Sequence, residues 1–116
     1  MRVLIIEDEK PAARRLERMI LECDPSIDVV DKIDSVEAAV NWLTTFSDPD
    51  LLFMDIQLAD GISFDIFSKV EVKAPVVFTT AYDQYMLQAF KVNSVDYLLK
   101  PIDPNELCAA LDKFKR

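Results

Sequence analysis

The sequence predicts an α/β fold, a doubly wound five-stranded parallel sheet of strand order 2-1-3-4-5 with helices on both faces. Short apolar runs alternate with amphipathic helical patterns along the whole chain. Strands separated by helices pair in parallel through right-handed crossovers. Two of the five predicted strands, the second and the fifth, have the mixed polarity of edge strands. The 116 residues suit a single domain spanning 1–116.

The five predicted strands differ in how apolar they are. The first, third and fourth are continuous apolar runs, which are typical of strands buried on both faces. The second contains Asp28, Asp31 and Lys32 among its apolar residues. In chain order the strands are expected at residues 3–6, 27–33, 51–54, 76–79 and 95–99.

Helical periodicity predicts five helices between and after these strands. Apolar residues spaced three and four apart mark a first helix that includes Leu16 to Cys23 and a second over residues 36–43, with Asp34 or Ser35 as its N-cap. Shorter helices are expected at 64–70 and 83–91. Before the last helix, Asp103, Pro104 and Glu106 have the spacing of a capping box with proline at the first helical position.

Several functional classes are excluded by composition. The chain has no histidine and a single glycine, Gly61. These absences exclude a Ser-His-Asp triad, a His-ligated zinc site, a phosphohistidine, a Walker loop and a GxGxxG fingerprint within this chain. The formal net charge of −8 disfavours direct binding to nucleic acid. No apolar run has the length of a membrane span, and the first residues do not resemble a signal peptide.

The two cysteines, Cys23 and Cys108, form neither a CxxC pair nor a zinc pattern. Both lie among apolar residues at helical spacing. We therefore expect two unpaired thiols in the core of a protein that works in a reducing, cytoplasmic environment.

Polar residues gather where the predicted strands end. Glu7, Asp8 and Glu9 follow the first strand, and Asp55 follows the third. Thr79-Thr80 end the fourth strand, and Lys100-Pro101 follow the fifth. In the order 2-1-3-4-5, strands one, three and four are neighbours, so these ends are expected to converge at one edge of the sheet.

Carboxylates that converge need a compensating positive charge. At ~4 Å and an effective dielectric constant of ~20, each pair repels by ~4 kcal/mol. Mg²⁺ suits a site with few carboxylates, several waters and a phosphate, and Lys100 supplies a second positive charge. With these parts, Asp55 can act as a carboxylate nucleophile in phosphoryl transfer. The hydroxyl of Thr80 and backbone N–H groups after Asp55 and Thr80 can hold phosphoryl oxygens.

Each of these residues also has an ordinary structural explanation when it is taken alone. An acidic helix N-terminus, a loop aspartate, a strand-end threonine and a surface lysine are all common. The functional interpretation depends on their joint placement at the ends of four strands of one sheet.

Four segments resemble response-regulator receiver domains of bacterial two-component systems, over the whole length of the chain. They are Val3-Leu4-Ile5-Ile6-Glu7-Asp8-Glu9, Leu52-Phe53-Met54-Asp55-Ile56, Thr79-Thr80-Ala81 and Asp96-Tyr97-Leu98-Leu99-Lys100-Pro101. The stretches 79–85 and 89–102 look like the LytTR-output subfamily, in which a β-rich DNA-binding domain follows the receiver. Nothing in this chain encodes that output domain. The resemblance implies the flavodoxin-like receiver fold.

The resemblance also implies a role for each site residue. Asp55 would accept a phosphoryl group from the phosphohistidine of a sensor histidine kinase. Asp8, Asp55 and the backbone carbonyl of Gln57 would ligate Mg²⁺, and Glu7 would assist through water. The phosphoryl-binding and switch residues would be Thr80, Ala81, Tyr97, Lys100 and Pro101, with a cis peptide between the last two.

The resemblance further implies a switch and its partners. Phosphorylation would draw Thr80 and Tyr97 inward and change the face formed by the fourth helix, the fifth strand and the fifth helix. That face could then form a homodimer, and DNA would be bound only through an output domain. Two residues depart from the family pattern: Glu7 replaces a common aspartate, and Ala110 replaces an arginine that bridges dimers of winged-helix regulators.

Two other functional classes fit the sequence less well. A metal-dependent phosphatase could use Asp55 as its nucleophile, but Gln57 stands where the commonest such family has its acid–base carboxylate. A phosphorylation-independent interaction module would not need Asp8, Asp55, Thr80 and Lys100 together. We therefore expect a phosphoacceptor rather than a turnover enzyme.

Overall fold

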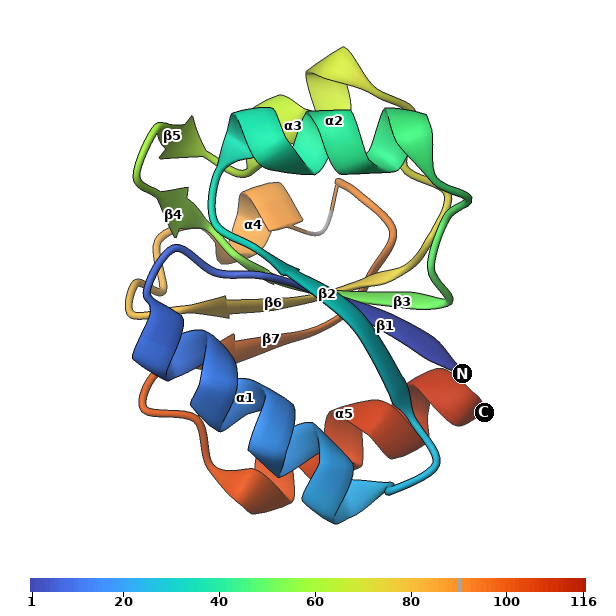
Figure 1. The fold of residues 1–116 in the computed structure, drawn as a ribbon. Coiled ribbons are helices and arrows are strands. Elements are labelled where there is room, and N and C mark those ends of the chain that lie inside the picture. Colours follow the sequence, from blue (N-terminus) through green and yellow to red (C-terminus); the bar gives the residue numbers. More distant parts are fainter. Residues whose placement is uncertain (90) are drawn as a thin grey trace.

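The computed structural model describes residues 1–89 and 91–116 and contains a five-stranded parallel sheet (Figure 1). The strand order is β2-β1-β3-β6-β7, which confirms the predicted order 2-1-3-4-5. Its strands are β1 (Arg2–Ile6), β2 (Asp28–Ile33), β3 (Leu51–Asp55), β6 (Val76–Thr80) and β7 (Ser94–Leu99).

Helices cover both faces of the sheet. Helices α1 (Lys10–Cys23) and α5 (Pro104–Lys115) lie side by side on one face (Figure 1). Helices α2 (Val36–Thr45), α3 (Phe64–Lys69) and α4 (Met86–Ala89) cover the other face. The three inner strands β1, β3 and β6 are therefore buried on both sides, as their continuous apolar sequences predict.

Successive residues of the inner strands pack alternately into two separate apolar cores. Leu4 and Ile6 pack on the side of α2 and α3, whereas Val3 and Ile5 pack on the side of α1 and α5. All four are fully buried. Full burial of such a side chain stabilises the fold by about 1.5–3 kcal/mol. The double-sided packing holds the carboxyl ends of these strands in fixed positions.

The helix starts agree with the predicted caps in part: of the two candidates Ser35 alone caps α2, and the described residues show no bond from Glu106 back to Asp103, so the predicted capping box of α5 is not formed. Ser35, and not Asp34, caps α2, because its Oγ accepts a hydrogen bond from the Ala38 N–H at 3.0 Å. Asp103 caps α5 by accepting from the Asn105 N–H at 2.7 Å, and Pro104 is the first helical residue. These bonds satisfy backbone donors that the first turn of a helix leaves free.

Two local elements differ from the prediction. A small antiparallel hairpin follows Asp55, made of β4 (Gln57–Leu58) and β5 (Gly61–Ile62). Two-residue strands are too short for sequence periodicity to reveal. The helix predicted over 83–91 is shorter, with α4 at Met86–Ala89 and a turn closed by the Met86 N–H and the Asp83 carbonyl before it. The prediction extended over residue 90, which lies outside the described residues.

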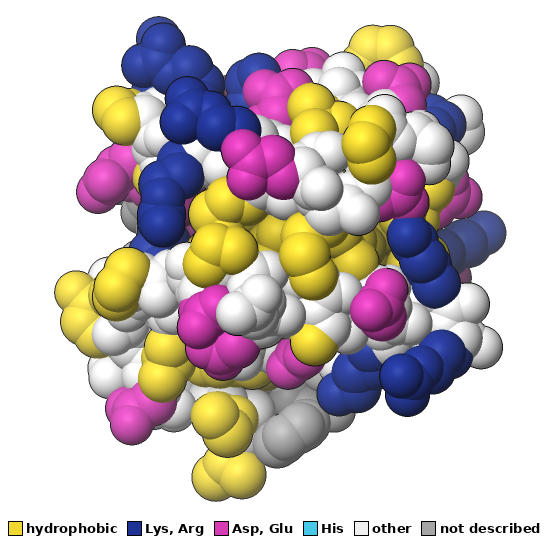
Figure 2. All heavy atoms as spheres, turned by 90° about the horizontal axis from the view of Figure 1, so that it is seen from below, with side chains coloured by type: hydrophobic (Ala, Val, Ile, Leu, Met, Phe, Trp, Pro, Cys, Tyr) yellow, Lys and Arg dark blue, Asp and Glu magenta, His cyan; other side chains and the backbone are white. Residues whose placement is uncertain are grey.

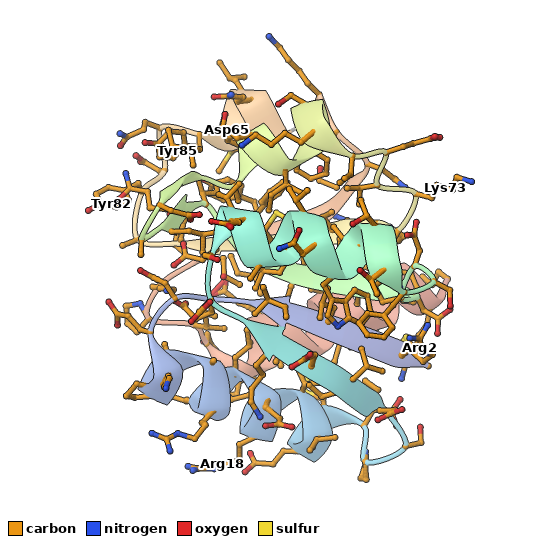
Figure 3. All side chains as sticks on the ribbon, turned by 45° about the horizontal axis from the view of Figure 1, so that its top comes forward. Arg2, Arg18, Asp65, Lys73, Tyr82 and Tyr85 are labelled. Carbon is orange, nitrogen blue, oxygen red and sulfur yellow. A yellow bond between two sulfur atoms is a disulfide. The ribbon has the colours of Figure 1, made fainter. Side chains whose placement is uncertain are left out.

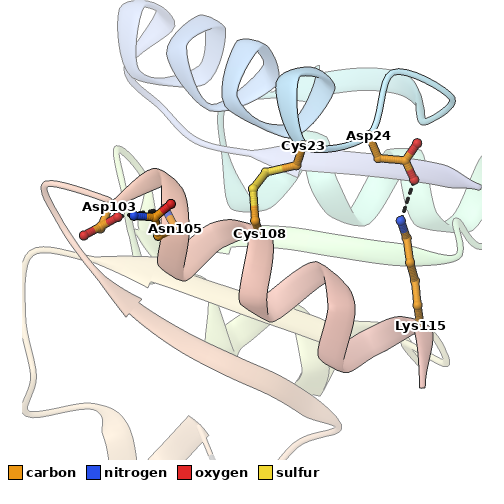
Figure 4. Close-up of a disulfide and its surroundings, with 6 residues drawn as sticks. All are labelled: Cys23, Asp24, Asp103, Asn105, Cys108 and Lys115. Carbon is orange, nitrogen blue, oxygen red and sulfur yellow. Dashed lines mark hydrogen bonds and ion pairs between the residues drawn. A yellow bond between two sulfur atoms is a disulfide. The ribbon is translucent and has the colours of Figure 1, made fainter.

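The expectation of two unpaired core thiols is wrong. Cys23, the last residue of α1, and Cys108 of α5 form a disulfide with a Cα–Cα distance of 5.6 Å (Figure 4). Both cysteines are only half-buried. Helical spacing placed each at the border of its helix's apolar stripe. Helical spacing does not reveal that these two borders face each other once α1 packs against α5.

The face built by α1 and α5 carries hydrophobic side chains along its middle, with lysine and arginine toward its borders (Figure 2). A groove of about 240 Å³ lies between α1 and the segment that follows β7. Pro11, Leu16 and Met19 line it from α1, and Pro101 and Ile102 line it from the segment after β7.

Among the described residues, no helix combines the length and the hydropathy needed to cross a membrane.

Candidate functional site

Three carboxylates meet at the carboxyl edge of the sheet. Glu7 and Asp8 directly follow β1, and Asp55 is the last residue of β3, which pairs with β1. One oxygen from each of the three lies within 4.8 Å of the others. Parallel strands that start in register end at the same edge, so this convergence follows from the topology.

Lys100 places its ammonium group between two of these carboxylates. Its Nζ donates to Glu7 Oε1 and, at 2.9 Å, to Asp55 Oδ2. The Lys100 backbone N–H donates to the Thr80 carbonyl at 2.7 Å, which fixes the residue at the end of β7. Burial lowers the pKa of Lys100, but the hydrogen bonds and charges of Glu7 and Asp55 outweigh it, so the pKa is raised. The cis Lys100–Pro101 peptide implied by the resemblance is present.

The electrostatics of Asp8 are different, since the lysine does not bond it. Partial burial and the neighbouring Glu7 carboxylate raise the pKa of Asp8 above its ordinary value of 3.8. Together they outweigh the weaker opposing effect of the Lys100 charge at this position. The oxygen-only donor set of Glu7, Asp8 and Asp55 suits a hard divalent cation, which would supply the missing positive charge.

A cleft of about 310 Å³ opens over this cluster. The Asp55 side chain is only 9% exposed, yet it lines the cleft and is therefore accessible from solvent. Glu7 is more deeply placed, with its side chain 2% exposed. The lining residues are Asp8, Glu9, Asp55, Gln57, Leu58, Ala81, Tyr82 and Lys100.

Gln57 connects the cluster to the segment before α4. Its backbone N–H lies 3.4 Å from Asp55 Oδ1, and its side-chain Nε2 donates to the Tyr85 hydroxyl at 3.1 Å. Tyr82 and Tyr85 lie at the same end of the molecule, opposite Arg2 (Figure 3). The involvement of Tyr85 was missed, because the sequence offered only its membership of the stretch 79–85.

Thr80 and Tyr97 both bond the backbone of Tyr82. Thr80 is fully buried, and its Oγ1 accepts from the Tyr82 N–H at 3.3 Å. The Tyr97 hydroxyl donates to the Tyr82 carbonyl, and its half-buried ring lies 6.5 Å from that of Phe78. Burial raises the pKa of Tyr97. These two predicted switch residues thus contact the wall of the cleft, while Ala81 and Lys100 line it directly.

Comparisons with known proteins agree with this geometry. Residues 3–112 match the family of the response regulator receiver domain. The sensory transduction protein LytT of Bacillus cereus is 40% identical over 100% of this chain and 48% of its own length. LytT of Enterococcus faecalis is 42% identical over 97% of this chain and 47% of its own length. The chain therefore spans about half the length of the curated relatives it matches.

Solved structures show the same fold. The response regulatory domain of protein mrkE from Klebsiella pneumoniae has a TM-score of 0.85 at 28% identity, covering 99% of this chain and 95% of that one. A two-component response regulator from Clostridium difficile also has a TM-score of 0.85 at 28% identity, covering 100% and 96%. The match to LytT agrees with the resemblance to the LytTR-output subfamily. The chain belongs to the response-regulator receiver domain family of two-component signalling.

Proposed function

We propose that this domain accepts a phosphoryl group on Asp55 in the presence of Mg²⁺, with a sensor histidine kinase as donor. The observation that carries the proposal is the position of the Lys100 ammonium, which bonds Asp55 Oδ2 at the floor of an open cleft. A carboxylate at such a place can attack phosphorus while a fixed cation balances the charge of the incoming group.

The metal would be held by Asp8, Asp55 and the backbone carbonyl of Gln57, with Glu7 acting through water. The clustered carboxylate oxygens fit a hard cation, and the neighbouring Glu7 carboxylate, after burial, contributes to the raised pKa of Asp8. Bound there, Mg²⁺ would supply neutralisation of the carboxylates and of the phosphoryl oxygens.

The transfer itself needs few groups from the protein. An Asp55 carboxylate oxygen forms a bond to phosphorus as the phosphorus–nitrogen bond of the donor's phosphohistidine breaks, and the electron pair of that bond stays on the imidazole. The ammonium of Lys100, the backbone N–H of Ala81 and the hydroxyl of Thr80 would bind the phosphoryl oxygens. In this scheme the protein is a phosphoacceptor that dephosphorylates itself and not a turnover enzyme.

Phosphorylation would then change the face formed by α4, β7 and α5. Thr80 would leave its bond to the Tyr82 N–H to reach the phosphoryl group, and Tyr97 would follow through their shared contact with Tyr82. Met86, Leu87 and Leu99 expose large apolar side chains on or beside this face. We propose that it forms a homodimer.

The proposed setting is the cytoplasm on the ground of the receiver family alone, because the Cys23–Cys108 disulfide removes the free thiols that indicated a reducing environment. Residues 1–116 would form the receiver unit of a transcription regulator there. The LytT relatives are about twice as long as this chain. A DNA-binding output domain would use that additional length in the whole protein, and contact with DNA would come only through it.

Intact-mass spectrometry after incubation with acetyl phosphate and Mg²⁺ tests the proposal. The wild-type chain is expected to gain one phosphoryl group, and Asp55→Asn is expected to gain none. Asp50→Asn is a matched control, because Asp50 directly precedes β3 and its carboxylate accepts from the Arg2 N–H, away from the cluster. Equal phosphorylation of wild type and Asp55→Asn would overturn the assignment.

A further inference from the structure

The turn between β4 and β5 bonds a helix that is distant from it in sequence. Asp60, at this turn, accepts hydrogen bonds from the Val36 N–H at 2.7 Å and the Glu37 N–H at 3.1 Å. Val36 and Glu37 are the first two residues of α2. One carboxylate therefore satisfies two of the free backbone donors at the start of this helix.

The start of α2 is thus capped from two directions. Ser35 precedes the helix in the chain and bonds the third N–H, that of Ala38. Since Ser35 already gives α2 an ordinary local cap, Asp60 is not required to begin the helix. Its bonds have a second consequence, because they hold the turn of the hairpin against α2.

The hairpin is short and is closed at its base by the Ser63 N–H, which donates to the Ile56 carbonyl at 2.7 Å. Its strands are two residues each, and isolated two-stranded hairpins are marginal in water. Gly61 has a φ of +153°, and a Cβ there would lie 3.8 Å from Val36 Cγ2, so the turn is close to α2. Within its two strands Leu58 is the buried apolar residue, with 8% exposure, and fully buried Ile56 directly precedes them, so the turn at the far end has few contacts of its own apart from α2.

The other end of the hairpin is the phosphoacceptor cleft. β4 begins at Gln57, whose N–H faces Asp55 Oδ1 and whose carbonyl is a proposed metal ligand. Two residues, Leu58 and Ala59, separate Gln57 from Asp60, whose carboxylate bonds α2. A displacement of the turn therefore moves the backbone of Gln57 relative to the side chains of Asp8 and Asp55.

We propose that Asp60 is a positioning residue for the metal site: by tying the β4–β5 hairpin to the start of α2, it fixes the carbonyl of Gln57 beside Asp8 and Asp55. This inference rests on the proposed function, since it requires Mg²⁺ to bind at that cluster. It also makes the start of α2 responsive to metal, because coupling between two sites is reciprocal.

The test compares Asp60→Ala with Ser35→Ala in the whole 116-residue chain. Both variants remove a cap from the same helix, but only the first releases the hairpin. Titration with MgCl₂, followed by the amide NMR signals of Asp8, Asp55 and Gln57, gives the metal affinity. Asp60→Ala is expected to weaken Mg²⁺ binding about tenfold, the usual loss when a supporting contact of a metal ligand is removed. Ser35→Ala is expected to leave it unchanged, and Asp60→Asn, which keeps one acceptor oxygen, to give an intermediate value.

Amide hydrogen exchange in the wild-type protein gives an independent readout that needs no variant to fold. Mg²⁺ is expected to slow exchange at Val36 and Glu37 and to leave Ala38 unchanged. Equal Mg²⁺ affinity in Asp60→Ala and Ser35→Ala would overturn the positioning role. Amide exchange rates at Val36 and Glu37 that are the same with and without Mg²⁺ would also overturn it. Absence of Mg²⁺-dependent shifts in the wild type would instead overturn the proposed function.

Discussion

The acidic cleft around Asp55 and the layer formed by α1 and α5 each join residues that are far apart in the sequence, but by different forces. In the cleft, Lys100 bonds Glu7 across 93 residues and Asp55 across 45 residues. In the layer, a disulfide joins Cys23 to Cys108 across 85 residues, and a salt bridge of 2.6 Å joins Asp24 to Lys115 (Figure 4). The bonds of Lys100 in the cleft are electrostatic and can rearrange, whereas the disulfide of the layer is covalent.

The two regions also differ in how far they follow from sequence. Strand ends of a parallel sheet meet at one edge, so the order of the strands places Glu7 beside Asp55 and puts Lys100 at the same edge, with β6 between β3 and β7. Helices packed side by side can rotate about their axes, and a small rotation moves Cys23 away from Cys108. Topology therefore predicts the cleft, while the helix contact depends on details of packing that only the structure contains.

The largest effect is expected from breaking the covalent contact. Reduction of the disulfide, or the double substitution Cys23→Ser with Cys108→Ser, frees a loop of 85 residues in the unfolded chain. The free energy of unfolding is expected to fall by about 2–4 kcal/mol. Urea denaturation with and without dithiothreitol measures it.

The same variant sharpens the comparison, because the cleft should not respond to it. Mg²⁺ affinity of the doubly substituted protein is expected to equal that of wild type. A loss of Mg²⁺ affinity in this variant would show that the cleft and the α1–α5 layer are coupled, which would contradict their independence.

A smaller effect is expected from removing the ammonium of Lys100. Lys100→Met leaves the carboxylates of Glu7 and Asp55 without their cation. The Lys100 side chain is 26% exposed, so solvent screens part of the lost attraction. We expect about 2 kcal/mol of destabilisation at pH 7 in EDTA. Adding Mg²⁺ should recover part of it, since the metal supplies positive charge to the same carboxylates. Thermal unfolding measures both values, and a deficit that Mg²⁺ leaves unchanged would contradict a shared charge cluster.

The smallest effect is expected at Asp8, where a substitution should raise the stability of the metal-free protein instead of lowering it. The folded-state pKa of Asp8 is raised above 3.8, so the native state holds the proton more tightly than the unfolded state does. Ionisation of Asp8 therefore costs stability as pH rises through that folded pKa. In EDTA at pH 7, Asp8→Asn is expected to raise the melting temperature. In Mg²⁺ the order should reverse, because wild type gains stability by binding the metal. A lower melting temperature for Asp8→Asn in EDTA would contradict the electrostatic account.

The sequence predicted the sheet order and the convergence of Glu7, Asp8, Asp55 and Lys100, because apolar periodicity locates strand ends well. The β4–β5 hairpin and the two backbone bonds of Asp60 were missed. Strands of two residues have no detectable period, and a carboxylate that caps a helix 23 residues away leaves no local signal. Thr80 was correctly placed at a strand end, but its bond to the Tyr82 N–H depends on a side-chain rotamer that sequence does not specify.

A crystal structure of the chain soaked in MnCl₂, with anomalous diffraction, tests the central claim most directly. Mn²⁺ takes the same oxygen ligands as Mg²⁺ and is located by its own scattering. We predict one ion within about 2.2 Å of carboxylate oxygens of Asp8 and Asp55 and of the Gln57 carbonyl. A cleft that stays without an ion at saturating Mn²⁺, or an ion bound to other carboxylates, would contradict the account.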